Sequence, residues 1–189
     1  TEPTKELTMA NASLYWFRQD LRLADLPGLI AASKSGQVIP VFIFDEALGG
    51  DWKLGGASQW WLHHSLQKLA ADLRAIGSRL VLRRGETVHV IAQLLEETGA
   101  QNVFASRQYQ PWADETEQGV RKVAESAGGA FKRYPGTLLF EPENIRTGGG
   151  TPFKVFTPFW RACLKQPAPA QPQPAPTLTS PNEWPHSEV

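Results

Sequence analysis

The sequence predicts an α/β fold built on a doubly wound, five-stranded parallel sheet. Apolar runs of strand length alternate along the chain with segments of helical periodicity, a pattern typical of parallel strands joined by crossover helices. The run Val38 to Phe44 is apolar at nearly every position, as expected of a strand covered by helices on both faces. The 189 residues are 41% hydrophobic and include seven Trp, which suffices for one buried core but not for two full domains.

The first predicted unit is a strand, a short helix and a second strand. The strand Ser13 to Phe17 is followed by a helix that Asp25 can cap and that has Pro27 near its first position. Gly36 ends this helix, and the second strand is Val38 to Phe44. The unit is therefore a βαβ crossover.

A long helix is predicted next, from Ala57 to Ile76, with Gly77 as its terminator. One face of this helix carries a stripe of aliphatic residues that should lie on the sheet. The stripe consists of Leu62, Leu66, Leu69, Leu73 and Ile76.

The rest of the sheet follows the same alternation. The expected elements are a strand at Leu80 to Leu82, a helix at Thr87 to Thr98, a strand at Val103 to Ala105, a helix at Ala113 to Ala127 and a strand at Phe131 to Tyr134. Gly99 stops the first of these helices and Gly128-Gly129 stops the second. The complete alternation of strands and helices is that of a Rossmann-like fold.

Composition divides the chain into three parts. Residues 1–12 are polar and are expected to form a flexible extension, and residues 13–165 form the α/β domain. From Gln166 onwards seven prolines exclude a helix or a central strand, so residues 166–189 are predicted to be an extended linker. Such a segment usually separates two domains, so the tail taken alone is compatible with a missing partner domain and equally with a disordered natural end.

Charge and cysteine content exclude several functions. The chain has 19 basic and 19 acidic residues, so no overall positive field would attract it to nucleic acid. Its one cysteine, Cys163, rules out an internal disulfide framework and is expected to be a buried apolar residue. No stretch has the length and apolarity of a signal peptide or a membrane span, which predicts a cytoplasmic protein with no membrane partner.

Several common site motifs are absent from the sequence. No Gly-x-Gly-x-x-Gly follows the first strand, and no phosphate-binding Gly-x-x-x-x-Gly-Lys-Ser/Thr occurs. His63 and His64 point about 100° apart on their helix, so we expect no metal site there. Asp114, Glu115 and Glu117 are interpreted as a charge cluster that interacts with the dipole at a helix N-terminus.

A ligand of such a sheet normally lies where the strand order reverses, which is here between the first and fourth strands. Two loops meet at this point, one carrying Arg18 to Arg22 and the other Arg107 to Trp112, and Phe44 with Asp45 ends the neighbouring strand. Aromatic faces beside amide and guanidinium donors suit a flat heteroaromatic ring with polar edges.

The residues at this point differ in how strongly they indicate a ligand. Trp16 and Phe17 are expected in the core, and for Asp20 the alternative to ligand binding is an ion pair with Arg22 that fixes the loop. Arg18, Gln108 and Gln110 are the better ligand candidates, because they have no obvious packing role.

Three segments together resemble the photolyase/cryptochrome family. They are Trp16-Phe17-Arg18-Gln19-Asp20-Leu21-Arg22, Gly55-Gly56-Ala57-Ser58-Gln59-Trp60-Trp61-Leu62 and Phe153-Lys154-Val155-Phe156-Thr157-Pro158-Phe159-Trp160. In the last segment Thr157 is expected to cap a helix that has Pro158 in its first position. The resemblance extends from about Ser13 to Lys165.

The resemblance implies an antenna domain. In this family the corresponding domain holds a light-absorbing chromophore, which is methenyltetrahydrofolate, a deazaflavin or flavin mononucleotide (FMN), and passes excitation to flavin adenine dinucleotide (FAD) in a helical C-terminal domain. That domain repairs UV-induced pyrimidine dimers and is absent from this chain, so we expect the chain alone to be inactive as a lyase and to meet damaged DNA only through its partner. Phe156, Phe159 and Trp160 are expected to dock on that domain or on the sheet's edge.

The identity of the chromophore stays open. Deazaflavin-binding members tend to have acidic residues where Gln108 and Gln110 stand, and one folate-binding group has a histidine near Lys53 and a carboxylate that Asp114 or Glu115 could supply. The expected chromophore-binding residues are Arg18, Asp20, Phe44, Asp45, Lys53, Gln108, Gln110, Trp112 and Glu115. An antenna-less structural domain, a cryptochrome photoreceptor and an independent nucleotide-binding module are the alternatives.

Overall fold

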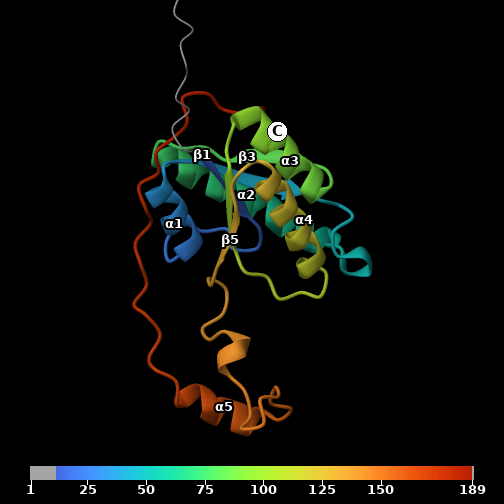
Figure 1. The fold of residues 1–189 in the computed structure, drawn as a ribbon, viewed down its shortest axis with the longest axis vertical. Coiled ribbons are helices and arrows are strands. Elements are labelled where there is room, and N and C mark those ends of the chain that lie inside the picture. The colour runs from blue at the N-terminus through green and yellow to red at the C-terminus, as the bar shows by residue number, and fades with distance from the viewer. Residues whose placement is uncertain (1–11, 189) are drawn as a thin grey trace, which may run out of the picture.

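Five parallel strands form one sheet in the order β3-β2-β1-β4-β5, in a computed structural model that describes residues 12–188 (Figure 1). The strands are β1 (Ala12–Phe17), β2 (Gln37–Phe44), β3 (Val81–Arg84), β4 (Asn102–Ser106) and β5 (Phe131–Tyr134). The helices are α1 (Pro27–Ser35), α2 (Gly56–Ala75), α3 (Thr87–Thr98), α4 (Ala113–Ser126) and α5 (Phe156–Leu164), with single turns of 3₁₀ helix at η1 (Gly50–Trp52) and η2 (Pro142–Asn144). The predicted α/β class is confirmed, and the strand order reverses between β1 and β4.

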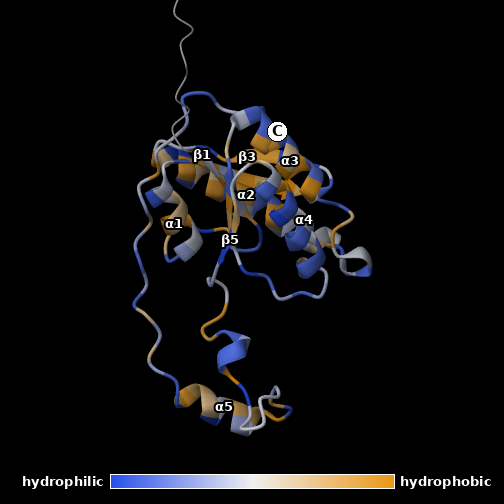
Figure 2. Ribbon diagram, viewed as in Figure 1, coloured by the Kyte–Doolittle hydropathy of each residue, from blue (hydrophilic) through white to orange (hydrophobic). Residues whose placement is uncertain are grey.

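Helices cover both faces of this sheet, because side chains of a strand alternate between its faces. Leu14 and Trp16 of β1 belong to an apolar cluster shared with α3 and α4, whereas Tyr15 and Phe17 belong to a second cluster shared with α1 and α2. All four side chains are buried. The hydrophobic sheet lies between two helical layers (Figure 2), as a doubly wound fold requires.

Most predicted elements are present within two residues of their expected ends. The helix Thr87–Thr98 and the strand Phe131–Tyr134 have the predicted bounds. The aliphatic stripe of α2 packs on the sheet, with Leu69 and Leu73 buried and the rest of the stripe partly buried. The predicted flexible extension lies outside the described residues except for Ala12, which is the first residue of β1.

Asp25 does not cap α1, contrary to the prediction. Leu26 occupies the N-cap position and no side chain caps the helix. Asp25 instead has a positive φ of 51°, and its backbone N–H and carboxylate hydrogen bond with Gln173 of the C-terminal segment. Tertiary contact with residues far along the chain has replaced the local cap.

The prediction that Thr157 caps the last helix is also wrong. Helix α5 begins at Phe156, its N-cap is Val155, and no side chain caps it. The helix stands apart from the sheet in Figure 1, and Figure 2 shows hydrophobic residues along it. Five large apolar side chains of this region are exposed, namely Val155, Phe156, Phe159, Trp160 and Leu164, whereas Cys163 is buried as expected.

Within residues 166–188 the proline-rich segment contains no helix, and its second half packs on the α/β domain. Thr179 forms a parallel bridge with Gln37 at the start of β2, and the N–H of Glu188 donates to the carbonyl of Leu82 in β3. Leu178 is buried, and Trp184 packs against the core beneath the guanidinium of Arg79. Residues 177–188 therefore act as a strap along one edge of the domain.

No helix within residues 12–188 has the length and apolarity needed to cross a membrane.

Candidate functional site

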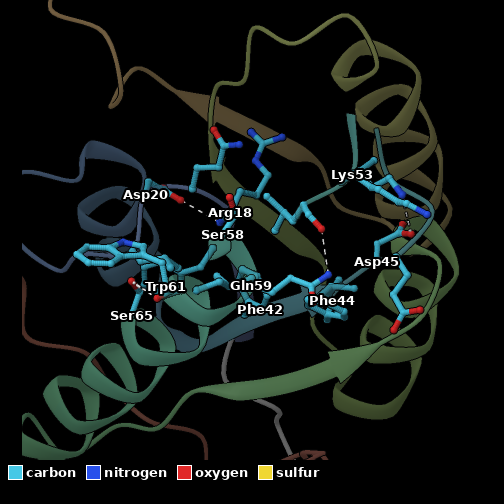
Figure 3. A pocket seen from close by; sticks show the side chains of 18 of the residues that line it. Arg18, Asp20, Phe42, Phe44, Asp45, Lys53, Ser58, Gln59, Trp61 and Ser65 are labelled. Atoms are coloured by element: carbon cyan, nitrogen blue, oxygen red, sulfur yellow. Dashed lines mark hydrogen bonds between the residues drawn. The ribbon is translucent and has the colours of Figure 1, made fainter. Parts of the chain in front are cut away.

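A cleft of about 1260 Å³ opens where β1 and β2 end, and α2 borders it (Figure 3). Aromatic rings make up much of its wall. They belong to Trp16, Phe17, Phe42, Phe44, Trp52, Trp60, Trp61 and Trp112. Trp61 lies at one end of the cleft and Lys53 at the other (Figure 3). The cleft is centred on the β1–β2 side of the switch point, next to the first half of α2.

The rim tryptophans have little protein around them. Trp52 in η1 is 79% exposed, and Trp60 and Trp61 near the start of α2 are 63% and 69% exposed. Aromatic rings in this state offer free faces for stacking with another flat group.

Seven of the nine predicted site residues line this cleft. They are Arg18, Asp20, Phe44, Asp45, Lys53, Gln108 and Trp112. Gln110 lies on a smaller neighbouring cavity, and Glu115 is exposed on α4 and lines neither space. Glu115 is thus the one predicted site residue placed away from both cavities.

Asp45 is occupied by the protein's own donors. One carboxylate oxygen accepts from the N–H groups of Ala47 and Leu48, and the other accepts from the N–H and hydroxyl of Thr87. This carboxylate fixes the turn after β2 and ties it to the start of α3. In contrast, Lys53 is exposed and forms no ion pair within residues 12–188.

Asp20 is likewise part of a buried network. Its carboxylate accepts from the Tyr15 hydroxyl at 3.0 Å, the Ser106 hydroxyl at 2.6 Å and the backbone N–H of Arg18 at 2.9 Å. The predicted ion pair with Arg22 is absent, since Arg22 donates to the backbone carbonyls of Asp25 and Gly136. Burial, with the carboxylate beside it, raises the pKa of Tyr15 far above its ordinary value, so its hydroxyl is a permanent donor.

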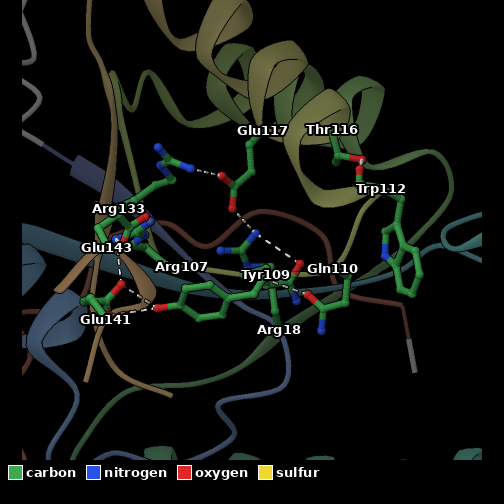
Figure 4. A network of polar contacts seen from close by, with 11 residues as sticks. Arg18, Arg107, Tyr109, Gln110, Trp112, Thr116, Glu117, Arg133, Glu141 and Glu143 are labelled. Atoms are coloured by element: carbon green, nitrogen blue, oxygen red, sulfur yellow. Dashed lines mark hydrogen bonds and ion pairs between the residues drawn. The ribbon is translucent and has the colours of Figure 1, made fainter. Parts of the chain in front are cut away.

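Arg18 is the centre of a second buried network (Figure 4). Its Nη1 donates to Glu117 at 2.7 Å and to Gln108 at 3.2 Å, and its guanidinium lies 4.6 Å from the ring of Trp16. Arg133 donates to the other oxygen of Glu117. Burial lowers the pKa of Arg18, while Glu117 opposes that shift. The carboxylate is thus shared by two arginines, one of them buried.

Glu117 was expected to belong, with Asp114 and Glu115, to a charge cluster at the N-terminus of α4, and for Glu117 this prediction is wrong. Asp114 and Glu115 do lie in the exposed first turn, but Glu117 is buried. A signal was present in the sequence, because Ala113, Glu117, Val120 and Ala124 recur at helical spacing and all four are buried. A carboxylate on the core-facing stripe of a helix needs a buried cation.

A third polar cluster lies beside the small cavity, outside the cleft. Arg107 forms ion pairs with Glu141 and Glu143, and the Tyr109 hydroxyl donates to Glu141 at 2.8 Å. Burial and the Glu141 carboxylate raise the pKa of Tyr109 to about 12, and the hydrogen bond from Arg107 lowers the pKa of Glu143. These contacts anchor the chain between β5 and α5 to the loop after β4.

The chemistry of the cleft is that of a binding site. Within the described residues, no group of His, Cys, Asp and Glu side chains is arranged to hold a metal ion. The carboxylates of Asp20 and Asp45 already accept hydrogen bonds from the protein on both oxygens, and much of the wall is aromatic. Its volume exceeds the usual 300 to 1,000 Å³ of small-molecule pockets, so a multi-ring heterocycle with a tail would fit.

Comparison with known proteins agrees with this geometry. The deoxyribodipyrimidine photo-lyase of Agrobacterium fabrum is 41% identical over 177 residues, which cover 93% of this chain and 36% of that protein. Cryptochrome-1 of Arabidopsis thaliana is 34% identical over 156 residues, covering 82% of this chain and 23% of that protein. The chain thus spans about a third or less of these relatives.

Solved structures show the same relationship. The crystal structure of a bacterial class III photolyase from Agrobacterium tumefaciens matches with a TM-score of 0.89 at 38% identity, covering 100% of this chain and 39% of that one. An archaeal photolyase from Sulfolobus tokodaii, whose structure contains two FAD molecules, matches with a TM-score of 0.72 at 28% identity and covers 88% of this chain and 37% of its own.

The family model described as DNA photolyase matches residues 13–177, which includes the whole sheet, the cleft and α5. With the fold, the aromatic cleft and these relatives in agreement, the chain belongs to the DNA photolyase family.

Proposed function

We propose that this chain is the light-harvesting domain of a photolyase and that its cleft binds the antenna chromophore. The observation that carries the proposal is the aromatic cleft itself, whose size and free ring faces suit a flat light-absorbing heterocycle. When bound, the chromophore supplies absorption of near-ultraviolet or blue light. The protein's task is to hold it rigidly.

The roles of the cleft residues follow from their positions. Phe44 and Trp112 line the cleft with aromatic rings, and Lys53 offers an exposed cation at one end of it. A phosphate or carboxylate on the tail of a flavin, deazaflavin or folate suits this ammonium group. Asp45 and Asp20 hold the loops around the ligand in place rather than bind it, because their oxygens already accept from the protein.

Methenyltetrahydrofolate, a deazaflavin and a flavin are all compatible with this site. The archaeal relative with two FAD molecules supports a flavin as one member of this set. We infer that the chromophore passes its excitation to FAD in a helical C-terminal domain of the parent protein. That domain would bind damaged DNA and repair pyrimidine dimers. The short coverage of the relatives supports such a partner domain.

Helix α5 is the proposed docking surface for that domain. Its large apolar residues are exposed, and the helix stands apart from the sheet (Figure 1). Exposed apolar patches of this kind usually mark an interaction site. The polar cluster of Arg107, Tyr109, Glu141 and Glu143 would then fix the segment that leads from β5 to α5.

A cryptochrome photoreceptor is the second candidate, favoured by the 34% identity to cryptochrome-1 over most of this chain. The two functions share an antenna-type domain. They would differ in whether the parent protein repairs irradiated DNA in light.

The test is a spectroscopic titration of the purified chain with methenyltetrahydrofolate, a deazaflavin and FMN. Saturable binding with a shifted near-ultraviolet or blue band supports the proposal. Trp112→Ala and Lys53→Ala should weaken that binding by about 1 to 3 kcal/mol, whereas Glu115→Ala, outside the cleft, should leave it unchanged. If none of the three compounds binds saturably, the antenna function is wrong.

A further inference from the structure

Two side-chain bridges cross the switch point between the loops that follow β1 and β4. Arg18 Nη1 donates to Oε1 of Gln108 at 3.2 Å, and Gln110 Nε2 donates to Oε1 of Gln19 at 3.0 Å. One donor and one acceptor of each pair are thus joined at the place where an open α/β sheet usually receives its ligand, while Nε and Nη2 of Arg18 have no hydrogen-bond partner among the described residues. We call the two pairs the double bridge.

The double bridge separates two spaces. On one side is the aromatic cleft of about 1260 Å³, and on the other is a cavity of about 200 Å³. Arg18, Gln19 and Gln108 line both spaces, and Gln110 lines the small one. The bridge is therefore the wall between them, and the small cavity falls below the usual volume of a small-molecule pocket.

Contacts with the rest of the protein fix the Arg18 side of this wall. Arg18 is fixed by Glu117 at 2.7 Å and by the ring of Trp16 at 4.6 Å, and its backbone N–H is held by Asp20. Moving the guanidinium aside would strand the charge of a side chain that is only 5% exposed. Unlike a surface side chain, it cannot swing away at small cost when a larger ligand arrives.

We propose that the double bridge determines the size of the ligand by closing the crevice between β1 and β4. The ligand is confined to the cleft beside β1, β2 and α2, and a compound whose second half must enter the crevice is rejected. This inference rests on the proposed function, because it assigns a specificity-determining role within the same site. It changes the expected role of Arg18 from ligand contact to barrier.

Two substitutions of Arg18 distinguish the effect of its volume from the effect of its charge. Arg18→Ala removes the inner wall, and Glu117 keeps Arg133 as a partner, so the carboxylate is not left unpaired. Arg18→Met keeps most of the volume without the charge. The double variant Gln108→Ala/Gln110→Ala removes one partner of each bridge. Both glutamines are half-buried, so this variant replaces Arg18→Ala in the test if Arg18→Ala does not fold.

The probes are FMN and FAD, which share the ring and differ by an adenosine monophosphate half. The dissociation constants of both are measured by fluorescence for the wild type and each variant. We expect the wild type to bind FAD no better than FMN. Arg18→Ala should shift the ratio of the two constants by about tenfold toward FAD, because the adenosine half can enter the joined space, and Arg18→Met should keep the wild-type ratio.

The outcomes distinguish this inference from the proposed function. If Arg18→Ala and Arg18→Met change the ratio equally, charge rather than volume is responsible and the barrier is wrong. If Arg18→Ala still rejects FAD, the bridge is not what excludes it, and the inference is wrong even where folate binds. If no chromophore binds to any variant, the proposed function fails as well.

Discussion

Arg18 at the end of β1 and Glu117 in α4 are 99 positions apart in sequence and form an ion pair of 2.7 Å, with side chains only 5% and 3% exposed. Glu117 also holds Arg133. Buried charges of this kind cost much more to break than exposed ones, because the remaining partner stays desolvated. The pair joins the ligand loop to the helix layer.

Glu117→Ala should therefore lower the free energy of unfolding by about 3 to 5 kcal/mol, since it leaves two arginines without their carboxylate. Urea unfolding followed by circular dichroism measures this change. Glu115→Ala is the matched control on the exposed face of the same helix and should stay within about 0.5 kcal/mol of the wild type. Equal effects of the two substitutions would contradict the structural role of the ion pair.

Tyr109 should ionise late. Its pKa is raised to about 12, mainly by burial and then by Glu141, from an ordinary value of 10.0. Because the folded pKa is the higher one, the stabilisation by the neutral phenol is complete below pH 10 and is lost as the pH rises through about 12. Alkaline titration of the phenolate absorbance, with Tyr109→Phe subtracted, reports this group.

Glu141→Gln removes the negative charge beside Tyr109 and should move the tyrosine's pKa down toward 10.0. Glu125→Gln, on the exposed side of α4, should have no such effect. A Tyr109 that titrates at its ordinary value in the wild type would show that the cluster does not form in solution.

The apolar surface of α5 should make the chain self-associate. Trp160 stacks on Phe156 and is 49% exposed, so replacing it with Ala removes part of a continuous patch. Sedimentation velocity should show a lower weight-average mass for Trp160→Ala than for the wild type at the same concentration.

Trp52→Ala is the control, because Trp52 is even more exposed but lies at the cleft, away from α5. If Trp52→Ala reduces association as much as Trp160→Ala does, α5 is not the responsible surface.

Leu178 should contribute to stability despite lying in a proline-rich segment. It is buried in the apolar cluster formed with α1 and α2. Leu178→Ala leaves a cavity there and should cost about 2 to 3 kcal/mol in unfolding free energy. Leu164→Ala on α5 changes an exposed leucine and should cost much less. No difference between the two would mean that the strap is detached in solution.

The sequence by itself determined the sheet, most helix bounds and the family. Strand and helix periods are local properties, so Thr87–Thr98 and Phe131–Tyr134 could be placed from their own residues. The strand order and the loops meeting at the switch point followed from the alternation of elements. Phe44, Asp45 and Trp112 were accordingly expected near the ligand, Lys53 was added by the family resemblance, and all four line the cleft.

Only the tertiary structure decided how the polar side chains are used. Asp25 bonds with Gln173, Glu117 with Arg18, and Gln110 with Gln19, and each pair joins residues 91 or more positions apart. Hydrogen-bond partners depend on which side chains the folded chain brings within about 3 Å, and sequence spacing carries no information on that. The topology indicated a ligand in the crevice between β1 and β4. Because the side chains of the double bridge fill that crevice, the cleft lies beside β2 and α2 instead.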